Sequence, residues 1–323
     1  MRQAAVARER RAHTIQRAPL PSSFPLAADT RVPAAGRVEK RRAASLYEQE
    51  YHLYVPPRPQ PARALLVAVH GISRNAREQA LRFAPFAEQY GVALVAPVFP
   101  RDRYSDYQRL GRLGKGERAD LALECIVSEV RQLLDLRADR VHLFGFSGGG
   151  QFVHRYAMAH PERVASLAVA AAGWFTFPDA DLEFPLGCRP TPDLPDLAFD
   201  RERFLRVPVH VFVGSRDRKR GPGFNRSRPL DLLQGRTRIE RGRRWVSAMR
   251  EAARRHRLST PYSFEILPGC WHSFERCATR GRLGERVFSS LFADIPTPAT
   301  SISTFGCGEE TTSSAAEQAV DAC

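Results

Sequence analysis

Residues 141–151 read VHLFGFSGGGQ, a short apolar run followed by a serine among glycines. Residues 141–146 form a short apolar run of one β-branched and several bulky residues, which is typical of a buried strand. A helical pattern begins at Gln151, so the chain has to turn sharply at Ser147. Gly145 and Gly149 stand two residues before and after the serine, where they let the strand and the helix approach without Cβ clashes. The segment therefore predicts a strand, a tight turn and a helix.

The five residues around the serine, Gly145 to Gly149, match the G-x-S-x-G pattern of a serine nucleophile. The N terminus of the following helix would lie beneath Ser147, and the amide of Gly148 would point to where an oxyanion forms. A pattern of this length also recurs by chance, and a phosphate-holding glycine loop or an ordinary turn would fit it. The nucleophile hypothesis therefore requires partner groups elsewhere in the chain.

The composition indicates one large domain with terminal tails, because the chain has 323 residues and 43% of them are hydrophobic. The formal net charge is +14, and the basic residues, almost all arginine, are concentrated in residues 201–260. No zinc-finger spacing or RNP-like aromatic pattern accompanies them, so we expect no nucleic-acid partner. These arginines form either a solvated face or a pocket for anionic substrates.

The six cysteines lack the spacing of a zinc finger or of a disulfide framework. Cys270 and Cys277 flank His272, but their spacing does not predict a metal site. We therefore expect no metal, no cofactor, and a reducing, cytoplasmic compartment. No apolar run approaches the roughly 18 residues of a membrane span, and the N terminus lacks the apolar segment of a secretory signal.

Strand-like and helix-like segments alternate along the chain, which predicts a mostly parallel sheet covered by helices, an α/β architecture. The expected strands are residues 46–56, 62–70, 92–99, 141–146, 164–172, 207–213 and 262–267. Besides the helix after Ser147, the expected helices are residues 76–90, 117–136, 237–257 and 281–293.

This pattern assigns residues 46–295 to a single domain. Residues 1–45, rich in Arg, Ala and Pro, predict a disordered basic leader, and residues 296–323 predict a disordered tail. Residues 174–206 lie between two expected strands and are rich in Pro, Phe and Asp. They predict a short lid insertion whose phenylalanines form an apolar wall over Ser147.

Four expected strands end in polar groups: His70, Ser147, Asp217 and His272. Such groups meet at the carboxyl ends of parallel strands. A serine hydroxyl needs a base, an imidazole can serve as that base, and a carboxylate can fix the imidazole tautomer. The order Ser147, Asp217, His272 is the one expected after this motif. We expect His70 to brace its loop rather than to carry a proton.

Other assignments of these residues are open. His272 could be a packed surface histidine, and Asp217 could cap the turn that follows it. Asp179 and Asp181, which follow the preceding strand, are rivals for the acid.

Residues 46–293 resemble the α/β-hydrolase superfamily, and within it small bacterial esterases and the polyhydroxyalkanoate-depolymerase-like branch. The resemblance implies a sheet of mostly parallel strands with Ser147 as nucleophile, Asp217 as acid and His272 as base. It also implies an oxyanion hole made by the backbone amides of Gly148 and Ile72. The segment around Ile72 reads HGIS, where many lipases have HGGG.

The function expected from these features is a serine hydrolase that cleaves a small carboxylic ester through an acyl-enzyme, with a preference for short acyl groups. Trp174, Tyr104 and Tyr107 are candidates for lining its pocket. Basic residues from Arg218 to Arg228 would favour an anionic ester if they face the pocket. Amide, thioester or lactone cleavage would use the same groups, and a non-catalytic binding protein is a further alternative. The sequence does not determine the oligomeric state.

Overall fold

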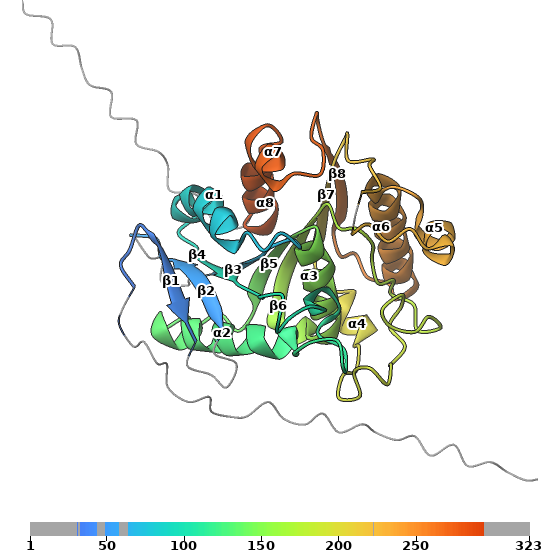
Figure 1. Ribbon diagram of the computed structural model, residues 1–323, viewed down its shortest axis with the longest axis horizontal. Coiled ribbons are helices and arrows are strands. Elements are labelled where there is room, and N and C mark those ends of the chain that lie inside the picture. The colour runs from blue at the N-terminus through green and yellow to red at the C-terminus, as the bar shows by residue number, and fades with distance from the viewer. Residues whose placement is uncertain (1–30, 32, 44–48, 58–63, 222, 294–323) are drawn as a thin grey trace, which may run out of the picture.

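The computed structural model describes residues 31, 33–43, 49–57, 64–221 and 223–293, and an eight-stranded sheet forms the centre of this part of the chain (Figure 1). The strands follow the spatial order β1-β2-β4-β3-β5-β6-β7-β8. β1 and β2 are antiparallel to their neighbours, and all other pairs are parallel. Their bounds are β1 Val38–Arg42, β2 Glu50–Tyr54, β3 Leu65–Val69, β4 Ala93–Pro97, β5 Val141–Phe146, β6 Val164–Ala170, β7 Val209–Gly214 and β8 Tyr262–Leu267.

Helices cover both faces of the sheet (Figure 1). One face carries α1 (Ala76–Gln89), α7 (Phe274–Thr279) and α8 (Leu283–Leu291), and the other carries α2 (Ala119–Leu133), α3 (Gly148–Ala159) and α6 (Arg238–Arg255). The shorter helices are η1 Tyr107–Arg109, η2 Pro161–Arg163, α4 Arg201–Phe204 and α5 Arg228–Gln234.

The apolar runs of the strands follow from this three-layer arrangement, because a strand covered on both faces needs apolar side chains at every position. In β3, Leu65, Val67 and Val69 join the core beneath α2, α3 and α6. Leu66 and Ala68, which alternate with them, join the core beneath α1, α7 and α8. The predicted α/β architecture is confirmed, and the parallel strands bring their carboxyl ends to one edge of the sheet.

The first strand lies inside the segment that the sequence assigned to a disordered leader. β1, with the sequence VEKRR, pairs with β2 from Val38↔Tyr54 to Arg42↔Glu50. It has a single apolar residue, so no alternation marked it as a strand. Its side chains are held by charge instead, since Lys40 pairs with Glu50 and the buried Arg41 pairs with Glu39. Residues 1–30 and the predicted tail, 296–323, lie outside the described residues.

The phenylalanines of the expected lid, residues 174–206, pack against the domain instead of forming an apolar wall over Ser147, and Trp174 is the residue of this range that lines the cavity beside Ser147. Phe175 stacks on Trp245 of α6 with ring centroids 4.7 Å apart, and Phe184 stacks on Phe199 at 4.8 Å. These phenylalanines and Phe177 belong to, or pack against, the core beneath α3 and α6. Periodicity could not distinguish phenylalanines that pack inward from phenylalanines that face a pocket.

In the part of the chain that the structure describes, no helix has both the length and the apolar character needed to cross a lipid bilayer.

Removal of β1 should destabilise the domain, because it strips one strand and exposes the hydrogen-bonding edge of β2. A chain that begins at residue 46 is expected to melt about 5 °C or more below one that begins at residue 31, given that about 1 kcal/mol shifts the Tm of a domain of this size by roughly 2–4 °C. Thermal unfolding of the two chains, followed by circular dichroism, measures this difference. Equal melting temperatures would show that β1 contributes nothing to stability.

Candidate active site

Ser147 occupies a strained turn between β5 and α3. Its φ is 56° and its ψ is −110°, a region that non-glycine residues rarely adopt, and its amide donates to Ala170 O at 2.8 Å. The glycines on either side are required by close packing. A Cβ on Gly145 would lie 2.3 Å from Gly149 O, and one on Gly149 would lie 2.0 Å from Val69 O. The turn thus places the serine side chain at the carboxyl end of β5, where it lines the cavity.

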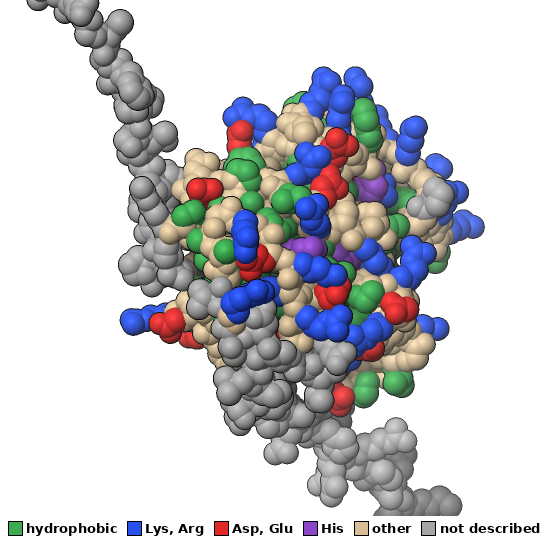
Figure 2. Space-filling model, turned by 60° about the vertical axis from the view of Figure 1, so that its left-hand side comes forward, with side chains coloured by type: hydrophobic (Ala, Val, Ile, Leu, Met, Phe, Trp, Pro, Cys, Tyr) green, Lys and Arg blue, Asp and Glu red, His purple; other side chains and the backbone are tan. Residues whose placement is uncertain are grey.

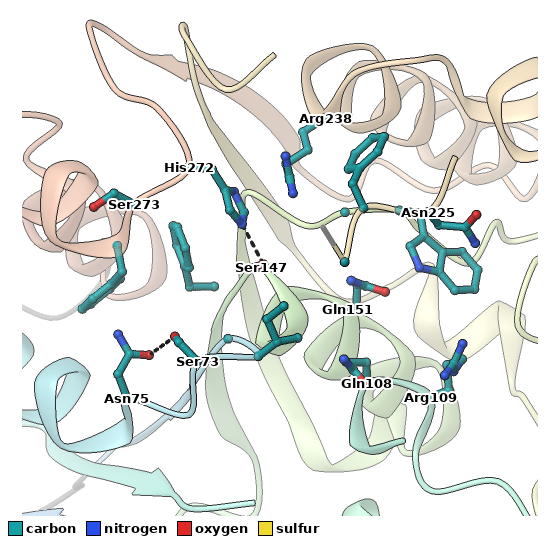
Figure 3. A pocket seen from close by; sticks show the side chains of 18 residues that line it. Ser73, Asn75, Gln108, Arg109, Ser147, Gln151, Asn225, Arg238, His272 and Ser273 are labelled. Atoms are coloured by element: carbon teal, nitrogen blue, oxygen red, sulfur yellow. Dashed lines mark hydrogen bonds between the residues drawn. The ribbon is translucent and has the colours of Figure 1, made fainter. Parts of the chain in front are cut away.

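The structure brings together the three side chains that the sequence proposed as a triad (Figure 3). Ser147 Oγ lies 2.9 Å from His272 Nε2, and His272 Nδ1 lies 2.8 Å from Asp217 Oδ2. Asp217 follows β7 and His272 follows β8, so the three groups come from three loops at the carboxyl edge of the sheet. Asp217 is buried, while His272 is partly exposed. The arrangement is that of a nucleophile, a base and an orienting carboxylate.

Arg238 holds the second oxygen of Asp217, a role that the sequence did not reveal. Its Nη1 donates to Asp217 Oδ1 at 2.9 Å and to Lys219 O at 3.2 Å. Burial lowers the pKa of the Arg238 guanidinium, and the Asp217 carboxylate opposes that shift. In the sequence Arg238 is one of several arginines in α6, so nothing separated it from the exposed ones.

Gly148 and Ile72 lie together beside Ser147. Gly148 is the first residue of α3, so its N–H has no acceptor within the helix and is available to an oxygen atom in the site. A Cβ on Gly148 would lie 3.0 Å from Ile72 Cγ2, which shows how closely the two segments approach. Ile72 is 44% exposed and lines the cavity at Ser147, next to Gly148.

His70 supports the loop that carries Ile72. The Phe99 amide donates to His70 Nε2 at 3.0 Å, so Nδ1 carries the proton and donates to Gly71 O at 2.8 Å. Burial lowers the pKa of His70 to about 4, which keeps the imidazole neutral near neutral pH. The Tyr107 hydroxyl donates to His70 O at 2.9 Å. This loop is therefore braced from beneath.

Of the three aromatic residues expected in the pocket, Trp174 lines it and the two tyrosines do not. Tyr104 and Tyr107 are fully buried and pack against Phe99, at centroid distances of 5.3 and 5.5 Å. The neighbouring residues Gln108 and Arg109 line the pocket in their place. Tyr107, the first residue of η1, also packs against Phe152 of α3, with ring centroids 6.3 Å apart.

The rival acids and the basic loop lie apart from these groups. Asp179 Oδ1 accepts from the Asp181 amide at 2.8 Å, whereas His272 contacts Asp217. In the loop after Asp217, the side chains of Arg218, Lys219, Arg226 and Arg228 are exposed and do not line the pocket. Figure 2 shows basic side chains spread over one face of the molecule with acidic ones among them. These four residues therefore fit the solvated face that the sequence left open.

The triad opens into a cavity of about 620 Å³ with Ser147 near its middle. Figure 3 shows Ser73, Asn75 and Ser273 on one side of Ser147 and Gln108, Arg109 and Asn225 on the other. The apolar part of the wall consists of Ile72, Phe146, Trp174, Phe224 and Phe274. Within the described residues there is no cluster of His, Cys, Asp and Glu that could hold a metal ion.

Comparisons with known proteins point to one fold. A family model described as alpha/beta hydrolase fold matches residues 71–205. Poly(aspartic acid) hydrolase-1 from Sphingomonas sp. KT-1 is similar in structure, with a TM-score of 0.67 and 20% identity over 80% of this chain and 99% of the other. A poly(3-hydroxybutyrate) depolymerase from Bordetella parapertussis has a TM-score of 0.65 and 24% identity over 82% and 92%. An acetyl xylan esterase from Aspergillus awamori has a TM-score of 0.52 and 14% identity over 79% and 99%. None of the curated proteins matches this chain.

Proposed function

We propose that this chain, which has the fold of the α/β-hydrolase superfamily, is a serine hydrolase that cleaves carboxylic esters through an acyl-enzyme intermediate. The observation that carries the proposal is the unbroken hydrogen-bonded path from Ser147 Oγ through His272 to Asp217. Each member stands at the carboxyl end of a different parallel strand, so the sheet sets their spacing.

In the acylation step, His272 Nε2 takes the proton of Ser147 Oγ as the serine attacks the carbonyl carbon of the ester. Asp217 accepts from His272 Nδ1 and stabilises the imidazolium that forms. The backbone amides of Gly148 and Ile72 donate to the negative oxygen of the tetrahedral intermediate. The imidazolium then protonates the leaving alcohol as the ester bond breaks, and the acyl group stays on Ser147.

In the second step, His272 takes a proton from a water molecule, and the resulting hydroxide attacks the acyl-enzyme. Collapse of the second tetrahedral intermediate releases the acid, and the proton on His272 returns to Ser147 Oγ. No metal or cofactor takes part in this scheme. A small-molecule ester is the proposed partner, and neither a nucleic-acid partner nor a metal ion is part of the proposal. The cytoplasmic location stays a prediction of the sequence.

Amide, thioester or lactone substrates would use the same atoms, and the triad alone does not distinguish them. We favour esters over amides because a leaving alcohol makes less demand on the general acid than a leaving amine does. A non-catalytic binding protein would not need the hydrogen-bonded geometry of Ser147, His272 and Asp217. Covalent labelling of Ser147 distinguishes a hydrolase from such a binding protein.

Ser147→Ala should abolish covalent labelling by a fluorophosphonate probe while the protein stays folded, because the nucleophilic oxygen is removed. Gel fluorescence after labelling measures this, and circular dichroism checks the fold. Ser273→Ala is the matched control, since Ser273 borders the same cavity and caps α7. Labelling that persists in Ser147→Ala at another serine would refute the assignment of the nucleophile.

Arg238→Gln should lower kcat about 10- to 100-fold with a smaller change in KM, because Asp217 would keep its charge but lose the donor that orients it. Asp217→Asn should cost more, about 10⁴-fold, since it favours the wrong tautomer of His272. Steady-state kinetics on a butyryl ester measure both, with Arg243→Gln on the same helix as the control. Partial rescue by Arg238→Lys is expected, and an unchanged kcat in Arg238→Gln would remove the positioning role.

Short acyl esters should be cleaved with the highest kcat/KM. The cavity has to hold both sides of the ester within about 620 Å³, and four amide side chains interrupt its apolar wall. A longer chain gains roughly 0.8 kcal/mol per CH₂ group only where an apolar surface receives it. The measurement is a series of p-nitrophenyl acetate, butyrate and octanoate. An optimum at octanoate or longer would contradict the expectation.

A further inference from the structure

Besides His272, the ionisable side chains that line the cavity are two arginines. They are Arg109 and Arg238, and no aspartate or glutamate is among the lining residues that the structure describes. Arg238 is occupied by Asp217, at the triad. Arg109 lies next to Gln108, away from His272, and its side chain is about one-third exposed (34%) (Figure 3). Nε and Nη2 of Arg109 contact Asp106 Oδ1, and Asp106 does not line the cavity, so a paired but partly exposed arginine borders this end of the cavity.

A second guanidinium lies directly behind this end of the wall. Arg155 of α3 is fully buried, and it contacts three residues that line the cavity. Its Nη1 donates to Gln108 O at 2.7 Å and to Gln151 Oε1 at 3.4 Å, and its Cζ lies 4.2 Å from the centre of the Trp174 ring. One layer of side chains thus separates this charge from the cavity.

Within the described part of the chain, Arg155 makes no ion pair with a carboxylate. Its third hydrogen bond, from Nε, goes to Thr176 Oγ1 at 2.9 Å, and the buried Nη2 has no hydrogen-bond partner among the residues that the structure describes. A buried guanidinium stays charged and is costly unless a negative group compensates it. The retained charge therefore produces a positive field at the neighbouring wall.

The surrounding charges do not cancel this field. Arg109 and Arg112 share Asp106, with Arg112 Nε 2.9 Å from Asp106 Oδ2, and Arg112 also lies 3.3 Å from Asp193. These two arginines and two aspartates balance one another. Arg155 leaves one positive charge in excess at this end of the cavity.

We propose that the substrate carries a carboxylate, which binds at the end of the cavity formed by Arg109, Gln151 and Trp174 with Arg155 behind it. This inference rests on the proposed hydrolase function, since it names the class of ester. Arg109 donates to the carboxylate directly, in a charge-assisted hydrogen bond. Arg155 contributes its field through the wall. The anionic recognition thus comes from Arg109 and Arg155 and not from the exposed basic residues after Asp217.

The test compares anionic esters with neutral ones of similar size on both sides of the ester bond. On the acyl side, mono-p-nitrophenyl succinate is compared with p-nitrophenyl butyrate. On the alcohol side, 4-acetoxybenzoate is compared with phenyl acetate. At low salt, one anionic ester should have a kcat/KM about tenfold or more above its neutral counterpart, as expected for a hydrogen bond between charged groups. The pair that shows the excess identifies the side that carries the carboxylate.

Arg109→Gln should remove most of this excess, and Arg112→Gln should keep it. Arg112 is the matched control because it shares Asp106 with Arg109 but does not line the cavity. The excess should also shrink in about 1 M salt, where the Debye length is about 3 Å. The inference is overturned if neither anionic ester exceeds its counterpart, or if the excess survives Arg109→Gln.

A binding measurement separates failure of this inference from failure of the hydrolase proposal. Calorimetric titration of the Ser147→Ala protein with glutarate and with neutral glutaramide requires no turnover. Weak binding of glutarate, lost in Ser147→Ala/Arg109→Gln and kept in Ser147→Ala/Arg112→Gln, supports the carboxylate site even if no ester is cleaved. Equal binding of glutarate and glutaramide by all three proteins overturns it even if Ser147 proves to be the nucleophile.

Discussion

The site depends on the close approach of β5, α3 and β3 around Ser147. A Cβ at Gly145 or Gly149 would collide with backbone oxygen atoms, so the turn can close only where side chains are absent. The turn puts Ser147 at a positive φ. The packing of the sheet on one side and of the buried helix α3 on the other stabilises this strained conformation. Because the backbone of Ser147 is held in this conformation, its hydroxyl stays directed at His272. The N–H of Gly148, the first residue of α3, stays without an acceptor in the helix.

The charged groups around Ser147 are held in fixed positions by hydrogen bonds and ion pairs. Both oxygens of Asp217 have a cationic or N–H partner, one from Arg238 and one from His272. This holds the carboxylate in one orientation, and the carboxylate in turn holds the imidazole that faces Ser147. On the far side of the cavity, Arg155 is buried among neutral partners. Within the described residues, one guanidinium is therefore paired with Asp217, and a second one has no carboxylate partner behind the wall of the cavity.

The buried residues His70 and Tyr107 support two loops at the cavity, the one with Ile72 and the one with Gln108 and Arg109, and do not line the cavity themselves. His70 stays neutral because its two ring nitrogens are occupied and burial disfavours its charged form. Tyr107 ties the same loop to η1, and through η1 it also sets the position of Gln108 and Arg109. An aromatic side chain that seemed suited to bind substrate thus positions the residues that do face the cavity.

The sequence by itself was sufficient for the α/β fold, the strands around the motif and the close pairing of Ser147, Asp217 and His272, because apolar runs and strand-end residues are local patterns. It did not reveal β1, whose polar residues are held by ion pairs with an adjacent strand. Nor could it separate Arg238, Arg109 and Arg155 from the many solvated arginines, or the phenylalanines of residues 174–206 from pocket residues. Burial and the choice of partner decide those roles, and both depend on segments far apart in the chain that meet only when the sheet is assembled.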